Sequence, residues 1–315
     1  MYAMIGTWRM ALEGIEKAMD LLKEGRSGEE ALSLAISEVE NFPFFKSVGY
    51  GGLPNRDGVV ELDAGFMRGS DLSFGAVGAM QDIKNPIQVA IRLSKEPFNN
   101  FLVGEGARQY AIDQGFEEEK MLTDRGRIHY ENRLKEEQEE LTPYAGHDTV
   151  GILAVDTKGD TYAGTSTSGL FMKHPGRIGD SPVPGGGYYA LNGVGAASAT
   201  GMGEDLMKGC ISYEIVKRME RGESPQEACD HGINTLEKNI YKESPRDLSV
   251  IAIDDQGNFG AASNIEDFSF VIALENKEPT VYLCRRENGK TIHEEATEKW
   301  LQEYMDRRMA KLERK

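Results

Sequence analysis

The stretch His147-Asp148-Thr149-Val150-Gly151 lies near the middle of the 315-residue chain and separates two kinds of sequence. Residues 117–140, before it, are rich in Glu, Lys and Arg and show little apolar periodicity, a pattern typical of a solvated helix or a flexible connector. After Thr149, apolar residues alternate loosely as far as Asp156, which predicts a β-strand. The stretch therefore joins an exposed lead-in to the start of a strand.

We predict from this position that the chain cuts its own peptide bond between Asp148 and Thr149. A threonine hydroxyl is a weak nucleophile and needs a base. The freed α-amino group would supply one, because its unperturbed pKa is about 7.7–8.0. Asp148 is close enough to assist the cut, and His147 would help or would fix the turn. The dipeptide alone is weak evidence, because Asp156-Thr157 has the same two residues in an expected hairpin turn.

Thr167 and the pair Arg177 and Asp180 are polar side chains downstream that suit such a site. Thr167 lies in Gly164-Thr-Ser-Thr-Ser-Gly169, at the end of the returning hairpin strand, where its hydroxyl can hydrogen-bond the nucleophile. Arg177 and Asp180 lie three apart in a proline-rich loop. A guanidinium binds a carboxylate by two parallel bonds and a carboxylate binds an ammonium, so the pair would clamp a free amino acid. The simpler interpretation of residues 164–169 is a polar turn, and that of Arg177 and Asp180 is a surface salt bridge.

Thr200 and Gly201 form the next candidate group, in Ala199-Thr-Gly-Met-Gly203. We expect a helix to begin here. The Thr200 hydroxyl and the Gly201 N–H would then form an oxyanion hole at the positive end of that helix. The plainer interpretation is that Thr200 is a helix N-cap.

The expected elements alternate between helices and strands in a mixed order. Ser27 with Glu30 forms an S-x-x-E capping box before a helix that ends near Asn41. We expect strands at about 2–8, 58–65, 71–80, 150–156, 162–168, 247–254, 259–264, 267–275 and 280–285, and helices at about 9–24, 86–94, 105–114, 201–221, 224–241 and 293–313. Antiparallel sheets between helix layers account for this order better than strict βαβ alternation.

Composition excludes several classes of protein. The net charge of −16 argues against nucleic acid as the main partner, because phosphate binding needs clustered Lys and Arg, and it equally disfavours an anionic membrane surface. Three widely spaced cysteines without a CxxC indicate free thiols in a reducing compartment. The N-terminus has no signal-peptide pattern, and no run approaches the ~20 apolar residues of a membrane span. A cytoplasmic location is the expectation.

The chain resembles a known family in segments that span nearly its whole length in the family's order: Ser47-Val-Gly-Tyr-Gly-Gly52, Lys84-Asn-Pro-Ile87, His147-Asp-Thr-Val-Gly151, Gly164-Thr-Ser-Thr-Ser-Gly169, Gly176-Arg-Ile-Gly-Asp-Ser-Pro182 and Thr200-Gly-Met-Gly-Glu204. They are similar to those of the N-terminal-nucleophile (Ntn) hydrolases of the glycosylasparaginase (aspartylglucosaminidase) and plant-type asparaginase/isoaspartyl peptidase superfamily. His-Asp-Thr before the cut and the Thr7-Trp8 pair resemble the glycosylasparaginase branch, whereas Gly-Thr is more usual in the other. Residues 290–315 lie outside the resemblance.

The resemblance implies an α+β fold, a four-layer αββα sandwich, and an assembly. Residues 1–315 would form a single domain that is cut into an α subunit, 1–148, and a β subunit, 149–315. Two such αβ heterodimers would assemble as a dimer. The chemistry as the family runs it needs no metal and no cofactor, and the five histidines are not at zinc-ligand spacing.

The resemblance also implies a role for each candidate in catalysis. Thr149 would be the nucleophile and, through its amine, the base. Thr167 would support it, and Thr200 with Gly201 would form the oxyanion hole.

On the substrate side, Arg177 would take the α-carboxylate and Asp180 the α-amino group. Trp8 would line the pocket beside the nucleophile, and Ser47 would help on the substrate side. The chain departs from the family at Met10, where an aromatic residue often stands. Preference for a sugar-bearing leaving group is therefore less firmly implied than the chemistry itself.

The activity implied is hydrolysis of the β-amide of a small molecule, N4-(β-N-acetylglucosaminyl)-L-asparagine, to L-aspartate and an aminosugar through a β-aspartyl ester on Thr149. The alternative within the class is an L-asparaginase or β-aspartyl (isoaspartyl) dipeptidase with the same mechanism. A nucleotide-binding protein is disfavoured, because Gly193-Val-Gly195 does not lie between an expected strand and helix. An uncleaved, inactive binding protein is the remaining possibility, and it would give one band on denaturing electrophoresis.

Overall fold

A computed structural model describes residues 1–136, 148–240, 246–266 and 268–315. Within these ranges, the larger of two sheets has nine strands in the order β13-β12-β11-β1-β5-β6-β2-β3-β4. All neighbours in it are antiparallel except β3 and β4. Its strands are β1 (Ala3–Thr7), β2 (Leu62–Arg68), β3 (Phe74–Met80), β4 (Phe101–Val103), β5 (Val150–Val155), β6 (Thr161–Thr167), β11 (Phe268–Leu274), β12 (Lys277–Glu287) and β13 (Lys290–Glu295).

The smaller sheet is antiparallel, in the order β10-β9-β8-β7, and it packs face to face with the larger one through β8 against β5 and β6. Its strands are β7 (Tyr188–Leu191), β8 (Gly195–Gly201), β9 (Leu248–Asp254) and β10 (Phe259–Ser263). The sheets approach closely at Gly151, where an added Cβ would meet the Ser198 hydroxyl at 2.2 Å. Every residue of β5 is buried, which explains why that strand shows only loose alternation in the sequence.

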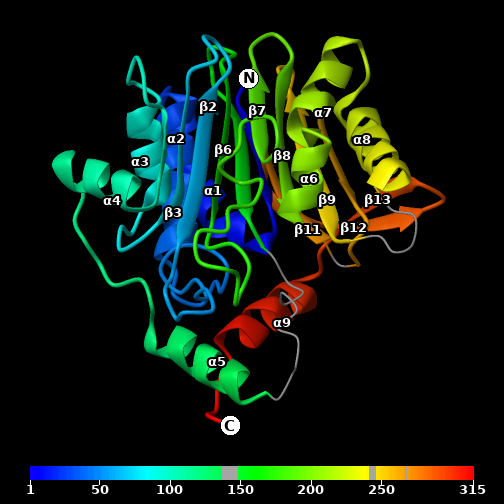
Figure 1. The fold of residues 1–315 in the computed structure, drawn as a ribbon. Helices are drawn as coiled ribbons and strands as arrows, with labels where there is room; N and C mark the ends of the chain where they lie inside the picture. The colour runs from blue at the N-terminus through cyan, green and yellow to red at the C-terminus, as the bar shows by residue number, and fades with distance from the viewer. Residues whose placement is uncertain (137–147, 241–245, 267) are drawn as a thin grey trace.

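Helices cover the two outer faces of the paired sheets, as Figure 1 shows. Within the described residues, four pack on the larger sheet: α1 (Leu12–Lys23), α2 (Gly28–Asn41), α3 (Pro86–Leu93) and α4 (Gly104–Asp113). Three lie on the smaller: α6 (Gly203–Lys208), α7 (Ile211–Glu220) and α8 (Pro225–Ile240). The others are α5 (Asp124–Lys135), α9 (Glu298–Met309) and a 3₁₀ turn, η1 (Arg9–Ala11). None of the helices in the described ranges has the length and apolarity needed to cross a membrane.

Local sequence signals account for most of these elements. The Ser27 side chain accepts from the Glu30 N–H and the Glu30 carboxylate accepts from the Ser27 N–H, which confirms the capping box that begins α2. Pro86 begins α3, and Gly25, at φ 78°, follows the end of α1. The mixed order of helices and strands in the sequence therefore correctly predicted two antiparallel sheets with helices packed outside them.

Two expected helices were wrong in their bounds. Residues 201–221 do not form a single helix, because β8 continues to Gly201 and the chain breaks again at Gly209 and Cys210, where Cys210 has φ 41°. The helix expected at 293–313 begins only at Glu298, because residues up to Glu295 pair with β12 as strand β13. The strands β4, β7, β8 and β13 were not foreseen. Thr200 is consequently a strand residue and not an N-cap, since the N-cap of α6 is Met202.

Candidate active site

Thr149 lies immediately before β5, and its backbone and side chain are held from three sides. The Thr149 N–H donates to the Thr200 hydroxyl oxygen at 3.0 Å, and the Thr149 carbonyl accepts from the Thr7 hydroxyl at 2.6 Å. The Thr149 hydroxyl lies 3.0 Å from the Ser181 hydroxyl. Thr149 is 5% exposed, so in the uncut chain this hydroxyl is closed to a molecule of substrate size. A residue fixed in this way has a defined direction of attack.

Trp8 and Thr200 form a second part of the site. The indole N–H of Trp8 donates to the same Thr200 hydroxyl oxygen at 3.2 Å, and its ring meets Phe268 edge-on with centroids 5.0 Å apart. Trp8 has φ 62°, a left-handed conformation that is rare for a bulky residue and that strand β1 and η1 hold in place. The Thr200 hydroxyl oxygen accepts hydrogen bonds from the Trp8 indole N–H and the Thr149 backbone N–H. Because both lone pairs of the oxygen are then used, the hydroxyl can take part in a further hydrogen bond only as a donor.

Gly201 follows Thr200 at the end of β8 with φ 132°, a conformation that favours glycine. A Cβ at this position would meet the Asp247 carbonyl oxygen at 2.2 Å, so the backbone has no room for a side chain. The predicted pair for an oxyanion hole is thus present beside Thr149, at a strand end rather than at a helix start.

Thr167 and Ser47 also lie close to Thr149, but the Thr167 hydroxyl does not make the expected hydrogen bond to the Thr149 hydroxyl. Continuing the β5–β6 register by one residue places Thr149 opposite Thr167. The Thr167 hydroxyl, however, donates to the Ser47 carbonyl at 3.1 Å and accepts from the Gly169 N–H at 3.0 Å. In the uncut chain the hydroxyl partner of Thr149 is Ser181, a residue inside the quoted 176–182 motif whose role the sequence did not suggest.

Arg177 and Asp180 lie in the loop between β6 and β7. The guanidinium of Arg177 makes two parallel bonds to Glu204, at 2.8 and 2.7 Å. Burial acts to raise the pKa of Glu204, but the hydrogen bonds and charge of Arg177, together with a backbone hydrogen bond, lower it below its usual value. Asp180 is 3% exposed, and one of its carboxylate oxygens has no hydrogen-bond partner among the described residues. Burial raises the pKa of Asp180 to about 7. The Arg177 guanidinium, which already binds the Glu204 carboxylate, thus lies near Asp180, whose carboxylate has an oxygen without a hydrogen-bond partner among the described residues.

A buried charge cluster, in which Lys173 of the same loop meets Glu61 and Asp63, was not foreseen. The Lys173 ammonium lies 3.7 Å from a Glu61 oxygen and 3.8 Å from an Asp63 oxygen, and all three side chains are at most 4% exposed. Burial raises the pKa of Asp63, while Lys173 acts against it. Asp63 pairs with Thr167 across β2 and β6, so the cluster joins the row of residues next to Thr149. An acidic residue inside an apolar strand, as in Leu62-Asp63-Ala64, was the available signal.

Before Thr149, the structure describes only Asp148 of the predicted cleavage junction, because His147 lies outside the described residues. Asp148 is 9% exposed, and its carboxylate accepts a hydrogen bond from the Arg308 guanidinium at 2.5 Å. No local pattern could have indicated this contact, since the two residues are 160 positions apart.

The chemistry that this set supports is acyl transfer by a hydroxyl group. A buried threonine hydroxyl, a neighbouring hydroxyl that must donate its proton, and a backbone N–H at a glycine are what an attacking oxygen and a developing oxyanion require. No three His, Cys, Asp or Glu side chains in the described parts of the chain are arranged to hold a metal ion.

Comparison with known proteins places the chain in a family. The family model described as Asparaginase matches residues 8–283. The N(4)-(β-N-acetylglucosaminyl)-L-asparaginase of Elizabethkingia miricola is 35% identical over 273 residues, covering 85% of this chain and 80% of that protein. The isoaspartyl peptidase/L-asparaginase of Xenopus laevis is 34% identical over 294 residues, covering 92% and 93%. The N(4)-(β-N-acetylglucosaminyl)-L-asparaginase of Rattus norvegicus is 32% identical over 303 residues, covering 85% and 87%. This chain belongs to the asparaginase family.

Proposed function

We propose that this protein is an amidohydrolase that cuts its own chain before Thr149 and then uses Thr149 as its nucleophile. The observation that carries the proposal is the contact of the Thr149 N–H with the Thr200 hydroxyl, because it places the nucleophile and the oxyanion-hole donor side by side. The two facing sheets with helices outside them support assignment of the fold as a four-layer αββα sandwich.

The self-cut proceeds as an N-to-O acyl shift. The Thr149 hydroxyl oxygen attacks the carbonyl carbon of Asp148, the C–N bond breaks, and the hydroxyl proton passes to the departing nitrogen. Water then hydrolyses the ester, leaving a carboxylate on Asp148 and a free α-amino group and hydroxyl on Thr149. That amine, beside the Thr200 hydroxyl, then acts as the base for the same oxygen.

The substrate class that fits is a β-amide of L-aspartate. Asp180 would bind the substrate ammonium, and Arg177 its α-carboxylate. Glu204 now occupies two N–H groups of Arg177, so the substrate carboxylate must displace it or use the remaining guanidinium N–H groups. Thr149 attacks the side-chain carbonyl, Thr200 and Gly201 stabilise the oxyanion, and the amine leaves. Hydrolysis of the β-aspartyl ester on Thr149 releases L-aspartate.

We propose N4-(β-N-acetylglucosaminyl)-L-asparagine as the substrate, on the names of the Elizabethkingia and rat relatives and on the His-Asp-Thr junction. Isoaspartyl dipeptides and L-asparagine form the second candidate, because the Xenopus isoaspartyl peptidase/L-asparaginase matches more of this chain, 92% of it. Met10 is buried at the position where the family often has an aromatic residue, so the sugar-bearing leaving group is less firmly implied than the chemistry itself. A dimer of αβ heterodimers and a cytoplasmic location complete the proposal; the free cysteines, Cys210, Cys229 and Cys284, support a reducing compartment.

N-terminal sequencing of the purified protein tests the proposal directly. We expect a second chain that begins Thr-Val-Gly-Ile-Leu, and a single uncut chain without amidase activity for Thr149→Ala. Thr149→Ser and Thr149→Cys keep a nucleophilic atom and should be cut, more slowly. Full amidase activity in an uncut Thr149→Ala protein would rule the mechanism out. Side-by-side kcat/KM values on the glycosylated, free and dipeptide substrates then choose between the two candidates.

A further inference from the structure

The C-terminal extension, residues 290–315, lies beyond the part of the chain that the family model matches, yet it returns to the cleavage junction. Strand β13 adds to the edge of the larger sheet, and α9 begins at Thr297, whose side chain accepts from the Trp300 N–H. Figure 1 shows α9 below the sheets beside α5. The C-terminal helix α9 thus brings Arg308 to Asp148, at the proposed cleavage junction.

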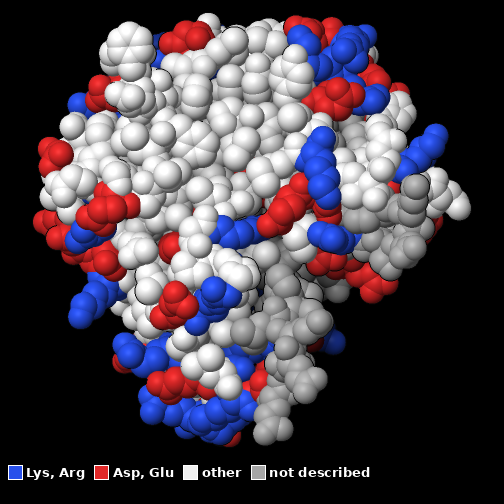
Figure 2. All heavy atoms as spheres, in the orientation of Figure 1, with Lys and Arg blue, Asp and Glu red and all other residues white. Residues whose placement is uncertain are grey.

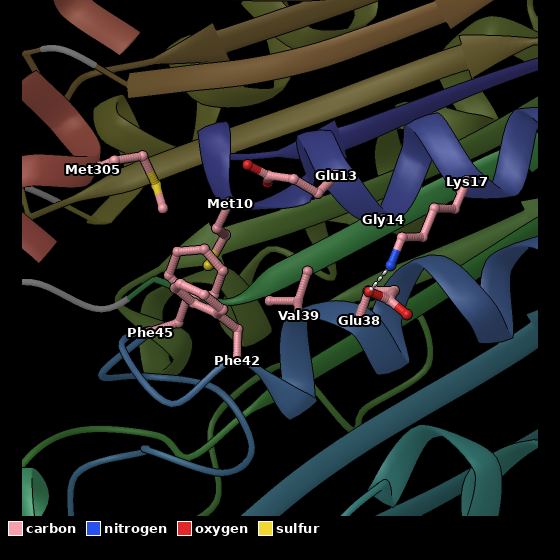
Figure 3. A pocket seen from close by; sticks show the side chains of 9 residues that line it. All are labelled: Met10, Glu13, Gly14, Lys17, Glu38, Val39, Phe42, Phe45 and Met305. Atoms are coloured by element: carbon pink, nitrogen blue, oxygen red, sulfur yellow. Dashed lines mark hydrogen bonds and ion pairs between the residues drawn. The ribbon is translucent and has the colours of Figure 1, made fainter. Parts of the chain in front are cut away.

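Helix α9 is anchored to the body of the protein by apolar contacts. Tyr304 is 6% exposed and belongs to the main apolar core, and Trp300, Leu301 and Met305 of the same helix are partly buried against that core. Met305 lines an apolar cavity of about 270 Å³ together with Met10, Val39, Phe42 and Phe45, as Figure 3 shows. Tyr304 and its neighbours thus seat α9 against the main core, four residues before Arg308.

Arg308, near the end of α9, contacts Asp148 through its guanidinium group. The two side chains are 19% and 12% exposed, and Arg308 also lies over the Tyr304 ring at 4.9 Å. An exposed ion pair contributes little to stability, but removing one partner of a mostly buried pair leaves a charge that water solvates poorly. Asp148 therefore depends on Arg308 for its place.

The tail after α9 holds the helix that precedes the junction. The Arg125 guanidinium donates to the carbonyls of Arg308, at 3.1 Å, and Ala310, at 2.8 Å. The Asn132 amide donates to the Glu313 carbonyl at 2.9 Å and accepts from the Lys315 N–H at 2.8 Å. Figure 2 shows Lys and Arg side chains gathered at this end of the molecule, surroundings that favour an anion such as the Asp148 carboxylate.

We propose that Arg308 is a positioning residue for the self-cut: by gripping the Asp148 carboxylate, it holds the Asp148 carbonyl in front of the Thr149 hydroxyl. The inference rests on the proposed autoproteolysis. The carboxylate and the carbonyl of one aspartate are joined through Cα and Cβ only, so fixing the first restricts the second. The Thr149 carbonyl and N–H are already fixed by Thr7 and Thr200. Arg308 supplies the matching restraint on the other side of the bond.

The test compares Arg308→Gln, Arg308→Lys and Arg307→Gln, the last being a matched control because Arg307 is exposed on the same helix. Newly synthesised full-length chains are followed in time by denaturing electrophoresis, with melting temperatures recorded. We expect Arg308→Gln to slow the cut by about tenfold or more, Arg308→Lys to restore part of the rate, and Arg307→Gln to match the wild type. The kcat/KM per cut molecule should not change, because the Arg308 contact is to Asp148 and not to Thr149.

Three outcomes would overturn the proposal. Equal cutting rates in Arg308→Gln and Arg307→Gln, with a wild type that cuts normally, would remove the positioning role and leave the autoproteolysis intact. A slow cut accompanied by a lower melting temperature, with no recovery in Arg308→Lys, would make Arg308 a residue of the fold only. A wild-type chain that never cuts would instead reject the proposed function, and the positioning role with it.

Discussion

Asp180 is a carboxyl group with almost no water around it, and its protonation decides whether it can bind an ammonium. Burial raises its pKa to about 7, and the nearby Arg177 only partly opposes this. Below that pH the carboxyl is neutral and its attraction for the substrate ammonium is lost. The Thr149 amine must also be neutral to act as a base, so both groups lose function as the pH falls.

We therefore expect kcat/KM of the cut enzyme to fall on the acid side with a slope of about 2 in a logarithmic plot against pH. A β-amide substrate without the α-amino group does not need the Asp180 charge, so its slope should be about 1. Initial rates between about pH 5 and 8 measure both. Identical slopes for the two substrates would show that Asp180 does not bind the ammonium.

At the scale of elements, the sequence signals that succeeded are those that act within a few residues. The Ser27 and Glu30 capping box begins a helix because both partners lie in one turn. Strand β8, Gly-Ala-Ala-Ser-Ala-Thr-Gly, was missed because small residues on both faces give no apolar alternation, and because close sheet packing selects them. That error placed Thr200 at the positive end of a helix, and without that helix end its candidate role rests on its contact with Thr149 and on the family resemblance.

The candidate residues that the sequence indicated lie in short motifs, and the contacts that it did not indicate join segments far apart in the chain. Thr200 and Trp8 came from local motifs. The Thr7 hydroxyl, the Lys173 cluster and Arg308 are positioned by strand pairing and by α9, over separations such as the 142 residues between Thr7 and Thr149. The spacing of apolar and polar residues within a short segment does not indicate which distant segment that segment will pair with, so a single sequence could not predict these contacts.

Gly201 allows a direct test of what the end of β8 requires. We expect Gly201→Ala to lower the free energy of unfolding by about 1–3 kcal/mol from backbone strain alone, and further because the Cβ would meet the Asp247 carbonyl oxygen. Gly193→Ala is the matched control: φ is also positive, 75°, but the residue is exposed and no atom lies within 4 Å. Its cost should be about 1 kcal/mol. Urea unfolding measures both; equal losses would mean that the close approach at Gly201 is relieved by a small shift.

At the scale of the molecule, the proposed cut divides a chain whose two parts share one sheet. Strand β1, from the first part, lies between β5 and β11 of the second, and β2 pairs with β6. The site is also shared: Thr7 and Trp8 come from the first part, and Thr149, Thr200 and Ser181 from the second. Cutting one peptide bond leaves all of these backbone hydrogen bonds in place.

We therefore expect fragments 1–148 and 149–315 to remain one particle after the cut. They should elute together in size-exclusion chromatography, at the volume of uncut Thr149→Ala, and separate only in denaturant. The physical reason is that separation would break three strand pairings and expose the buried apolar faces of β1 and β5, and each Å² of apolar surface returned to water costs about 25 cal/mol. Arg125 and Asn132, bonded to the tail of the second fragment, add contacts across the same division. Recovery of an active, folded 149–315 fragment free of 1–148 would contradict this, because it would show that β5 and the Thr200 contact form without β1 and Trp8.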